Sequence, residues 1–342
     1  MKRFLMFNCL LILALTGCNI NNNLNKGFYV AGWLTNDLSN AVNVFKANTA
    51  VFNEINPVWY SVKSDGTISE HPFSSEVIIS NAGMFGVKVV PTIQDVGSGN
   101  IKTHIRDTTK MENHLNSIVA LVEKNGYSGI DIDYEKFNLG DKGAFTSFIS
   151  KLGQQLHRRG KSLSVTVNPK TFSFQSDNAK EEDWAAIAPA VDTMKIMVYG
   201  YHLSEKLGSN CPKSALEGNL NYAKSIPELK GKVVIGLPLY GYDNSKKDGM
   251  KTIWYRNALE LIQKYNPQVM RGSNLSWKDS IEPNFTYKID TEEHTVHYQD
   301  AQALDERLAI IQQYRDVVKG VTFWQFGDED PKMWEVLRNY KK

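Results

Sequence analysis

The sequence has few cysteines, little net charge and no long hydrophobic run. Cys9, Cys18 and Cys211 are the only cysteines among 342 residues, too few for the disulfide framework of a small secreted domain. The mostly apolar stretch Phe4–Leu15 is shorter than the roughly 20 residues that a membrane-spanning helix needs. The net charge of +2 gives no indication of a polyanionic partner such as nucleic acid.

The N-terminal segment has the features of an export signal. Lys2 and Arg3 precede the short apolar core, as in a signal peptide. Leu15-Thr16-Gly17-Cys18 then resembles a bacterial lipobox, which implies cleavage before Cys18 and a palmitate-type lipid on its thiol. We therefore expect a signal peptide over 1–17, a flexible Asn-rich tether over 18–26 and a lipoprotein in the membrane of the cell envelope. Secretion without a lipid is the alternative.

The rest of the chain alternates short apolar runs with longer amphipathic segments, which is typical of βα units. The predicted strands are Phe28–Leu34, Ala50–Ile55, Val87–Ile93, Ser128–Glu135, Leu163–Asn168, Thr193–Tyr199, Val233–Tyr240 and Val321–Phe326. Eight such units predict an α/β fold of the (β/α)8 TIM barrel type over 27–342. A doubly wound open sheet is the alternative, but such sheets place their chemistry in loops outside the strands.

The connection between the seventh and eighth predicted strands is the longest. It contains a predicted helix over Ile253–Tyr265 and a Thr-, Tyr- and Val-rich stretch over Asn284–Tyr298. The polar residues 290–293 interrupt that stretch, which predicts a hairpin. We expect a small insertion at about 266–298 rather than a separate domain. Asp300, just beyond it, is expected to cap the following helix.

The fourth predicted strand carries three carboxylates. Asp131, Asp133 and Glu135 alternate with apolar residues, so all three face the same side of a strand. Unpaired buried charges are costly, and crowded carboxylates push their pKa values apart. The active site of such a barrel lies at the C-terminal strand ends. Glu135 would reach highest, as a proton donor supported by Asp133, with Asp131 deepest.

Two other interpretations of these carboxylates remain open. Hard metal ions prefer oxygen ligands, but the segment contains no histidine and its carboxylates stack along the barrel axis instead of converging. The three groups could also form a purely structural buried network.

Four segments in order resemble glycoside hydrolase family 18, which includes chitinases, endo-β-N-acetylglucosaminidases and spore-cortex-lytic enzymes. The segment ending at Glu135 resembles the family signature D-x-x-D-x-D-x-E. The other three are Met197-Val198-Tyr199-Gly200-Tyr201-His202, Val234-Ile235-Gly236-Leu237-Pro238-Leu239-Tyr240-Gly241-Tyr242, and Gly320-Val321-Thr322-Phe323-Trp324-Gln325-Phe326-Gly327 followed by Asp330-Pro331.

The resemblance implies a retaining glycosidase that cleaves β-1,4 bonds after N-acetylglucosamine, with the substrate's own acetamido group as nucleophile. Glu135 would protonate the leaving oxygen and then activate water. Asp133 would orient the acetamido group, and Tyr199 would bond its carbonyl. Trp324 would lie beneath the distorted sugar, with Asp131 completing the catalytic row.

Further substrate contacts are expected at other strand ends, from Met197, Tyr240, Trp33 and Gln325. Asn168 is a weaker candidate of the same kind, and Trp59 and Tyr60 either stack on sugars or pack under loops. Two positions depart from the family pattern. Ser128 occupies the place of the first motif Asp, and Gly200 replaces the Asp that follows the sixth-strand Tyr.

A non-catalytic glycan-binding protein on the same barrel is the competing hypothesis. Family lectins typically lose the motif Glu, whereas this chain keeps Glu135. A solute-binding lipoprotein would instead show two lobes and a hinge. The expected partners are a glycan containing N-acetylglucosamine (chitin oligomers, peptidoglycan or N-glycans) and a membrane reached through Cys18. We expect no cofactor, no metal, no nucleic acid and a monomer.

Overall fold

The computed structural model describes residues 27–35, 40–71, 75–97, 99–201, 208–272 and 280–341. The predicted signal peptide, the lipidation site Cys18 and the tether lie outside these residues, and so does His202 of the sixth-strand motif. No helix within the described ranges has the length and apolar character to cross a bilayer.

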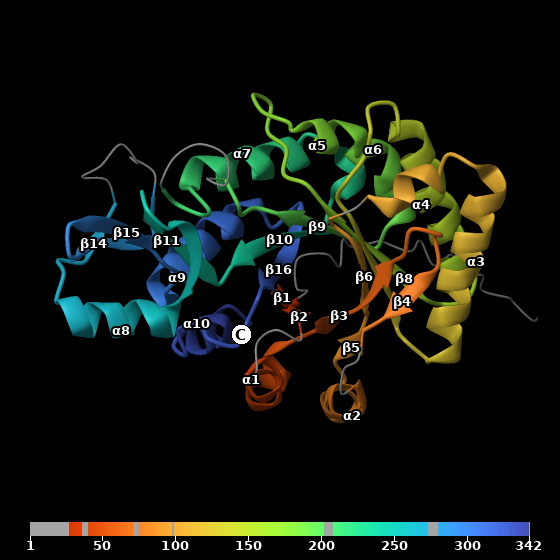
Figure 1. Cartoon of the computed structure of the whole chain (residues 1–342). Helices are drawn as coiled ribbons and strands as arrows, with labels where there is room; N and C mark the ends of the chain where they lie inside the picture. Colours follow the sequence, from red (N-terminus) through yellow and green to blue (C-terminus); the bar gives the residue numbers. More distant parts are fainter. Residues whose placement is uncertain are drawn as a thin grey trace, which may run out of the picture.

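A closed parallel sheet forms the centre of the molecule (Figure 1). Its strands are β1 (Tyr29–Val30), β2 (Trp33–Leu34), β3 (Glu54–Val62), β6 (Thr92–Asp95), β7 (Gly129–Tyr134), β8 (Ser162–Val167), β9 (Thr193–Met197), β10 (Val233–Pro238) and β16 (Val318–Trp324). β1 and β2 are consecutive pieces of the first predicted strand. Because β1 pairs with β16 and β2 pairs with β3, this one segment closes the barrel. The predicted barrel is confirmed.

Helices cover the outside of the sheet (Figure 1). They are α1 (Ala41–Asn48), α2 (Ser75–Phe85), α3 (Thr108–Lys124), α4 (Lys142–His157), α5 (Asp177–Glu181), α6 (Trp184–Ile187), α7 (Lys213–Lys224), α9 (Ala301–Ile311) and α10 (Met333–Lys341). α3 shows why they form. The Asp107 side chain accepts from the Lys110 N–H and caps the helix, while residues at helical spacing, Leu115, Ile118 and Val122, are buried against the sheet.

The insertion between β10 and β16 is a second, antiparallel sheet with its own helix (Figure 1, on the left). It contains β11 (Tyr240–Ser245), β12 (Gly249–Trp254), α8 (Tyr255–Tyr265), β13 (Met270–Arg271), β14 (Pro283–Ile289) and β15 (Glu292–His297). β14 and β15 form the expected hairpin. The insertion begins at Tyr240, earlier than the expected 266, because β11 pairs with β15. Phe285 and Val296 are completely buried in its small core.

Two predicted boundaries are wrong. The second strand runs over 54–62 instead of 50–55, since Thr49–Val51 forms a 3-10 turn. Pro57 does not end β3, whose pairing with β6 shifts register just beyond it. The last strand, predicted over 321–326, runs over 318–324 instead, because α9 already ends at Ile311 and only a 3-10 turn over Gln312–Tyr314 separates it from β16. The capping role of Asp300 is confirmed, because its side chain accepts from the Ala303 N–H.

Candidate active site

A cleft of about 970 Å³ opens at the C-terminal ends of the barrel strands. Its lining includes most of the predicted site residues, namely Glu135, Asp133, Tyr199, Trp324, Met197, Tyr240 and Trp33. These side chains come from five different strand ends, those of β2, β7, β9, β10 and β16, which are up to about 300 residues apart in sequence. The parallel barrel brings them together, because all its C-terminal strand ends meet at one face.

Asp133 and Glu135 form the upper layer of carboxylates. Asp133 is 8% exposed, and its Oδ1 is buried with no hydrogen-bond partner in the described structure. Burial, followed by the charges of Glu135 and Asp131, raises the pKa of Asp133 well above its ordinary value. Burial also raises the pKa of Glu135, with Lys136 opposing the shift. This layer therefore holds protons at a pH where ordinary carboxylates have lost them.

Asp131 lies one layer deeper and belongs to a paired network. Its Oδ1 is 3.2 Å from the Lys195 Nζ, and its Oδ2 accepts from the Trp33 indole N–H at 3.1 Å and the Thr92 hydroxyl at 2.9 Å. The same ammonium lies 3.1 Å from Glu54 Oε1. Asp131 is fully buried and does not line the cleft, so its place is beneath the site and not in contact with a substrate.

Gln325 also stays off the cleft wall, although we expected it there. It is 4% exposed and is not among the lining residues, whereas its neighbour Trp324 lines the cleft. Trp59 and Tyr60 are likewise buried, and the Tyr60 hydroxyl bonds that of Tyr127 at 2.8 Å. They pack in the core.

Aromatic rings form the walls around the two carboxylates. Trp33 and Trp324 meet edge to face with centroids 6.1 Å apart, and Tyr199 meets Tyr240 in the same way at 6.4 Å. Burial, followed by the charge of Tyr240, raises the pKa of Tyr199 well above its usual value. Tyr199 therefore keeps its hydroxyl proton and can donate it in a hydrogen bond. Phe174, 57% exposed, stands at the rim.

Sequence reasoning missed two polar groups at the site. Gln94 lines the cleft, and β6 pairs it with Asp133 in register. The alternation Thr92-x-Gln94 beside Asp131-x-Asp133 is the signal that would have found it. Glu182 is fully buried behind the wall and accepts from the Asn168 backbone N–H at 2.9 Å and its side-chain amide at 2.7 Å. This clamp holds Asn168 in the cleft lining, where it was expected.

Gly200 takes a backbone role at the position where the family pattern has Asp. Its φ of +77° lies in the left-handed region, and its N–H donates to Asn210 Oδ1 at 2.7 Å. The Asn210 amide in turn donates to the Tyr240 carbonyl at 3.0 Å. Gly200 therefore fixes the turn after β9 and leaves that part of the cleft wall without a side chain.

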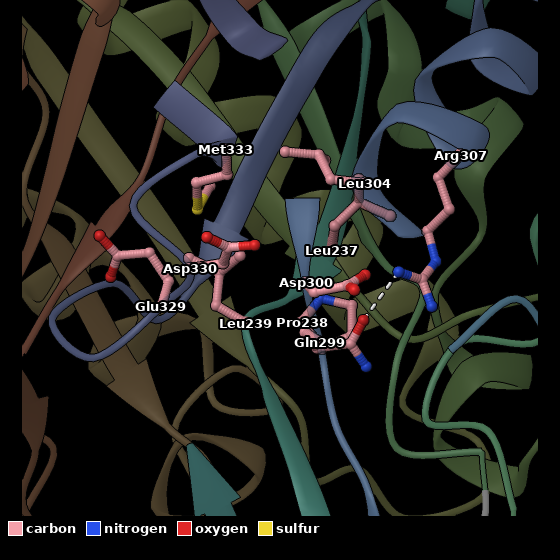
Figure 2. A pocket seen from close by; sticks show the side chains of 10 residues that line it. All are labelled: Leu237, Pro238, Leu239, Gln299, Asp300, Leu304, Arg307, Glu329, Asp330 and Met333. Carbon is pink, nitrogen blue, oxygen red and sulfur yellow. Dashed lines mark hydrogen bonds between the residues drawn. The ribbon is translucent and has the colours of Figure 1, made fainter. Parts of the chain in front are cut away.

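A second cavity, shown in Figure 2, lies between the end of β10 and α9. It measures about 10 Å³, which is about the size of one water molecule. Arg307 bonds Gln299 at 2.7 Å there and pairs with the buried Glu282 at 2.6 Å. This cavity is a structural void. Across the described ranges, no group of three His, Cys, Asp or Glu side chains is arranged to hold a metal ion.

The comparisons with known proteins agree with this geometry. The family model of glycosyl hydrolases family 18 matches residues 28–330. The glycosylase YvbX of Bacillus subtilis is 28% identical over 241 residues, which cover 68% of this chain and 67% of the relative. The cortical fragment-lytic enzyme of the same species is 24% identical over 245 residues, 68% of this chain and 54% of the relative. The chain thus spans two thirds or less of these relatives' lengths.

Solved structures share the whole fold. A chitinase from Chromobacterium violaceum has a TM-score of 0.80 and 22% identity, covering 92% of this chain and 98% of that one. The spore cortex-lytic enzyme SleL of Bacillus megaterium has a TM-score of 0.82 and 21% identity, covering 92% and 74%. With its eight-stranded barrel, its carboxylate row and a family match over nearly all described residues, the chain belongs to glycosyl hydrolases family 18.

Proposed function

We propose that this glycoside hydrolase cleaves β-1,4 bonds after N-acetylglucosamine by a retaining, substrate-assisted route. The observation that carries the proposal is the pair Asp133 and Glu135, whose pKa values are both raised, at the floor of an aromatic-walled cleft. A general acid needs a proton at working pH and a position beside the departing oxygen. Glu135 has both, because burial favours its neutral form and it lines the cleft.

Asp133 fits the role of orienting the acetamido group. Its Oδ1 has no partner within the described structure, so an amide N–H of the substrate would satisfy a group that is otherwise left buried and unpaired. Attack of the acetamido oxygen on the anomeric carbon breaks the glycosidic bond, and Glu135 gives its proton to the leaving oxygen. Water then opens the resulting oxazolinium, with Glu135 taking the proton back.

The aromatic walls fit the remaining requirements. The Tyr199 hydroxyl, which keeps its proton, can donate to the acetamido carbonyl. Trp324 offers a flat apolar face to the C–H surface of the sugar and excludes water from the reacting bond. Met197, Tyr240 and Trp33 complete the inner wall. We assign these five residues as the substrate-contacting surface.

Peptidoglycan and chitin oligomers are the two glycans that we favour. The relatives and structural neighbours carry names of both kinds, cortex-lytic enzymes and chitinases. Both polymers present N-acetylglucosamine in β-1,4 linkage, which is what the proposed chemistry requires. High-mannose N-glycans are a third candidate. The Gly200 position leaves part of the wall open, which suits a sugar with a bulky substituent.

The test is product release by the protein and its Glu135→Gln variant. We expect the unchanged protein to release reducing ends from chitooligosaccharides, peptidoglycan or a high-mannose glycopeptide, and the variant to be slower by about 10²–10⁴-fold. Glu112→Gln, on the exposed face of α3, is the matched control and should keep full activity. No product from any glycan with either protein would refute the enzyme proposal and favour glycan binding alone.

Inhibition by a thiazoline analogue of the cyclised acetamido group distinguishes the substrate-assisted mechanism from one in which the acetamido group is not the nucleophile. The analogue mimics the oxazolinium, so a substrate-assisted enzyme should be inhibited competitively, and Asp133→Asn should weaken that inhibition. Activity without any inhibition would exclude the acetamido group as nucleophile.

We also propose that the protein is a lipoprotein of the cell envelope. Its support is the sequence alone: a signal peptide over 1–17, lipid on Cys18, a tether over 18–26 and the barrel over 27–342. Labelling of expressing cells with a palmitate analogue should mark the protein, and Cys18→Ala should abolish the label. An unlabelled, freely released product would contradict the anchor.

A further inference from the structure

The end of the barrel opposite the cleft is strongly basic. We define this basic end as the last helical turns, the loops that lead into the barrel strands and the first two residues of those strands, including the C-terminal turn of α10. Its thirteen cations are Lys46, Lys88, Lys124, Arg158, Arg159, Lys161, Lys224, Lys230, Lys232, Arg315, Lys319, Arg338 and Lys341. Its five acidic residues are Glu54, Glu123, Asp192, Glu228 and Asp316. Elsewhere the described chain has 20 Lys and Arg against 29 Asp and Glu.

Ion pairs already neutralise most of the acidic groups at this end. Three pairs do so: Arg159 with Glu123 at 3.2 Å, Lys224 with Asp316 at 3.5 Å and the buried Lys195 with Glu54 at 3.1 Å. By contrast, Lys46, Lys88, Arg158 and Lys230 are exposed, and no carboxylate of the described structure pairs with them. The surface charge that remains is positive.

Structural roles explain some of these cations but not all. Lys46 lies in the last turn of a helix, where it complements the helix dipole. Lys161 and Lys232 donate to backbone carbonyls at 2.7 Å and stabilise loops. Lys88 begins the short strand β5 (Lys88–Val89), and Lys230 stands in the loop before β10, so neither has such a role.

The chain enters the barrel at the same end. Gly27 lies beside the Lys341 carbonyl, the Arg315 guanidinium lies over the Phe28 ring at 5.1 Å, and the Lys319 ammonium lies over the Tyr29 ring at 4.5 Å. The nine residues 18–26 span at most about 30 Å when fully extended. A lipid on Cys18 would therefore keep this end close to the membrane surface.

We propose that the basic end docks on the anionic headgroups of the membrane that carries the lipid anchor. The inference rests on the proposed lipidation of Cys18. Lys and Arg are attracted to anionic headgroups within a Debye length of the surface, and the short tether brings them into that range. Docking turns the cleft away from the membrane, so that the substrate is a glycan strand on the far side and not a membrane-bound sugar.

The test uses the lipidated full chain on vesicles of phosphatidylcholine, with or without phosphatidylglycerol. Amide hydrogen exchange is followed in the loops 158–161 and 229–232. We expect exchange in both loops to slow by about threefold or more on the anionic vesicles, and the protection to disappear at about 0.5 M NaCl. Exchange in the loops of the cleft should be the same on both vesicles.

The decisive variant replaces Lys46, Lys88, Arg158 and Lys230 by Glu and should lose the protection. Its matched control replaces four exposed lysines of the insertion by Glu and should keep the protection. These are Lys246, Lys247, Lys264 and Lys288. Both variants should cleave soluble chitooligosaccharides like the unchanged protein, which separates this test from that of the active site. Equal protection on both vesicles, equal loss in both variants, or a Cys18 without lipid would overturn the proposal.

Discussion

Two layers of buried carboxylates, one above the other in the barrel, have opposite surroundings. In the lower layer, the ammonium of Lys195 pairs with both Asp131 and Glu54. Burial there would raise the pKa of Glu54, yet Lys195 and Lys319 bring it below its ordinary value. In the upper layer no cation forms an ion pair with Asp133 within the described residues. The more distant charge of Lys195 opposes the shift, but burial and the neighbouring carboxylates outweigh it, and the pKa of Asp133 rises. Burial alone therefore does not decide protonation; a direct ion pair with a buried cation does.

Because only the lower layer is ion-paired, we infer that the lower layer positions side chains and that the upper layer binds substrate. A paired layer fixes side chains in place, because each carboxylate oxygen has a donor within hydrogen-bond distance. In an unpaired layer a buried carboxylate oxygen lacks a hydrogen bond, which is unfavourable in free energy, and a substrate that supplies the bond removes this penalty. Trp33 links the two, since its indole N–H bonds Asp131 below while its ring lines the cleft above.

The largest loss of folding stability is expected when the ion pairs of the lower layer are removed. Lys195→Met would leave Glu54 and Asp131 buried without their cation, which costs about 3–5 kcal/mol of unfolding free energy. Chemical denaturation measures it. The same substitution at Lys151, whose ion pair with Glu112 is exposed to solvent, should cost less than about 1 kcal/mol. Equal losses would show that the lower layer is not special.

Removing the Trp33–Asp131 hydrogen bond, which links the two layers, should lower the stability by a smaller amount. Trp33→Phe removes the indole donor to Asp131 and should cost about 1.5–3 kcal/mol, because the bond is to a charged group. Trp184 provides the matched control, since it is equally buried and its indole nitrogen has no partner in the described structure. Trp184→Phe loses similar packing but no hydrogen bond. Thermal melting that falls equally in both would contradict the link.

Removing the charge of Asp133 in the upper layer should increase the stability instead of lowering it. In the folded protein Asp133 keeps its proton to a higher pH than the unfolded value of about 3.9, so stability falls as pH rises above that value. Asp133→Asn cannot ionise and should raise the melting temperature at pH 7–8, by about 2–4 °C per kcal/mol relieved. The gain should shrink at pH 4, and activity should be lost.

Asp131→Asn sharpens the comparison, because it removes a paired charge instead of an unpaired one. It should lower the melting temperature at neutral pH, although it lies only two residues from Asp133 on the same strand. A melting temperature that moves in the same direction in both variants would mean that the two layers do not differ as described.

Much of the fold could be predicted because it rests on local rules. The apolar runs placed seven of the eight barrel strands, and the polar residues 290–293 located the turn of the β14–β15 hairpin. The second strand was misplaced, because the 3-10 turn at Thr49–Val51 and the tolerance of Pro57 depend on neighbouring strands. The insertion was underestimated for the same reason, since β11 is defined by pairing with a strand some fifty residues later.

The candidate site could be predicted only in part. Family motifs located Glu135, Asp133, Tyr199 and Trp324, and all four line one cleft. Gln325 was misplaced, because the motif gives the order of residues and not the direction of their side chains. Glu182 carries no motif and reaches the wall only through its bonds to Asn168.

The sequence by itself determined that Asp131, Asp133 and Glu135 face one side of a strand, because the alternation of side chains is a local property of the extended backbone. The tertiary structure alone decided which of them would be paired. Lys195 and Glu54 come from strands that are distant in the chain, and barrel closure sets them at the level of Asp131, below Asp133. Protonation follows from these three-dimensional distances, which no local pattern encodes.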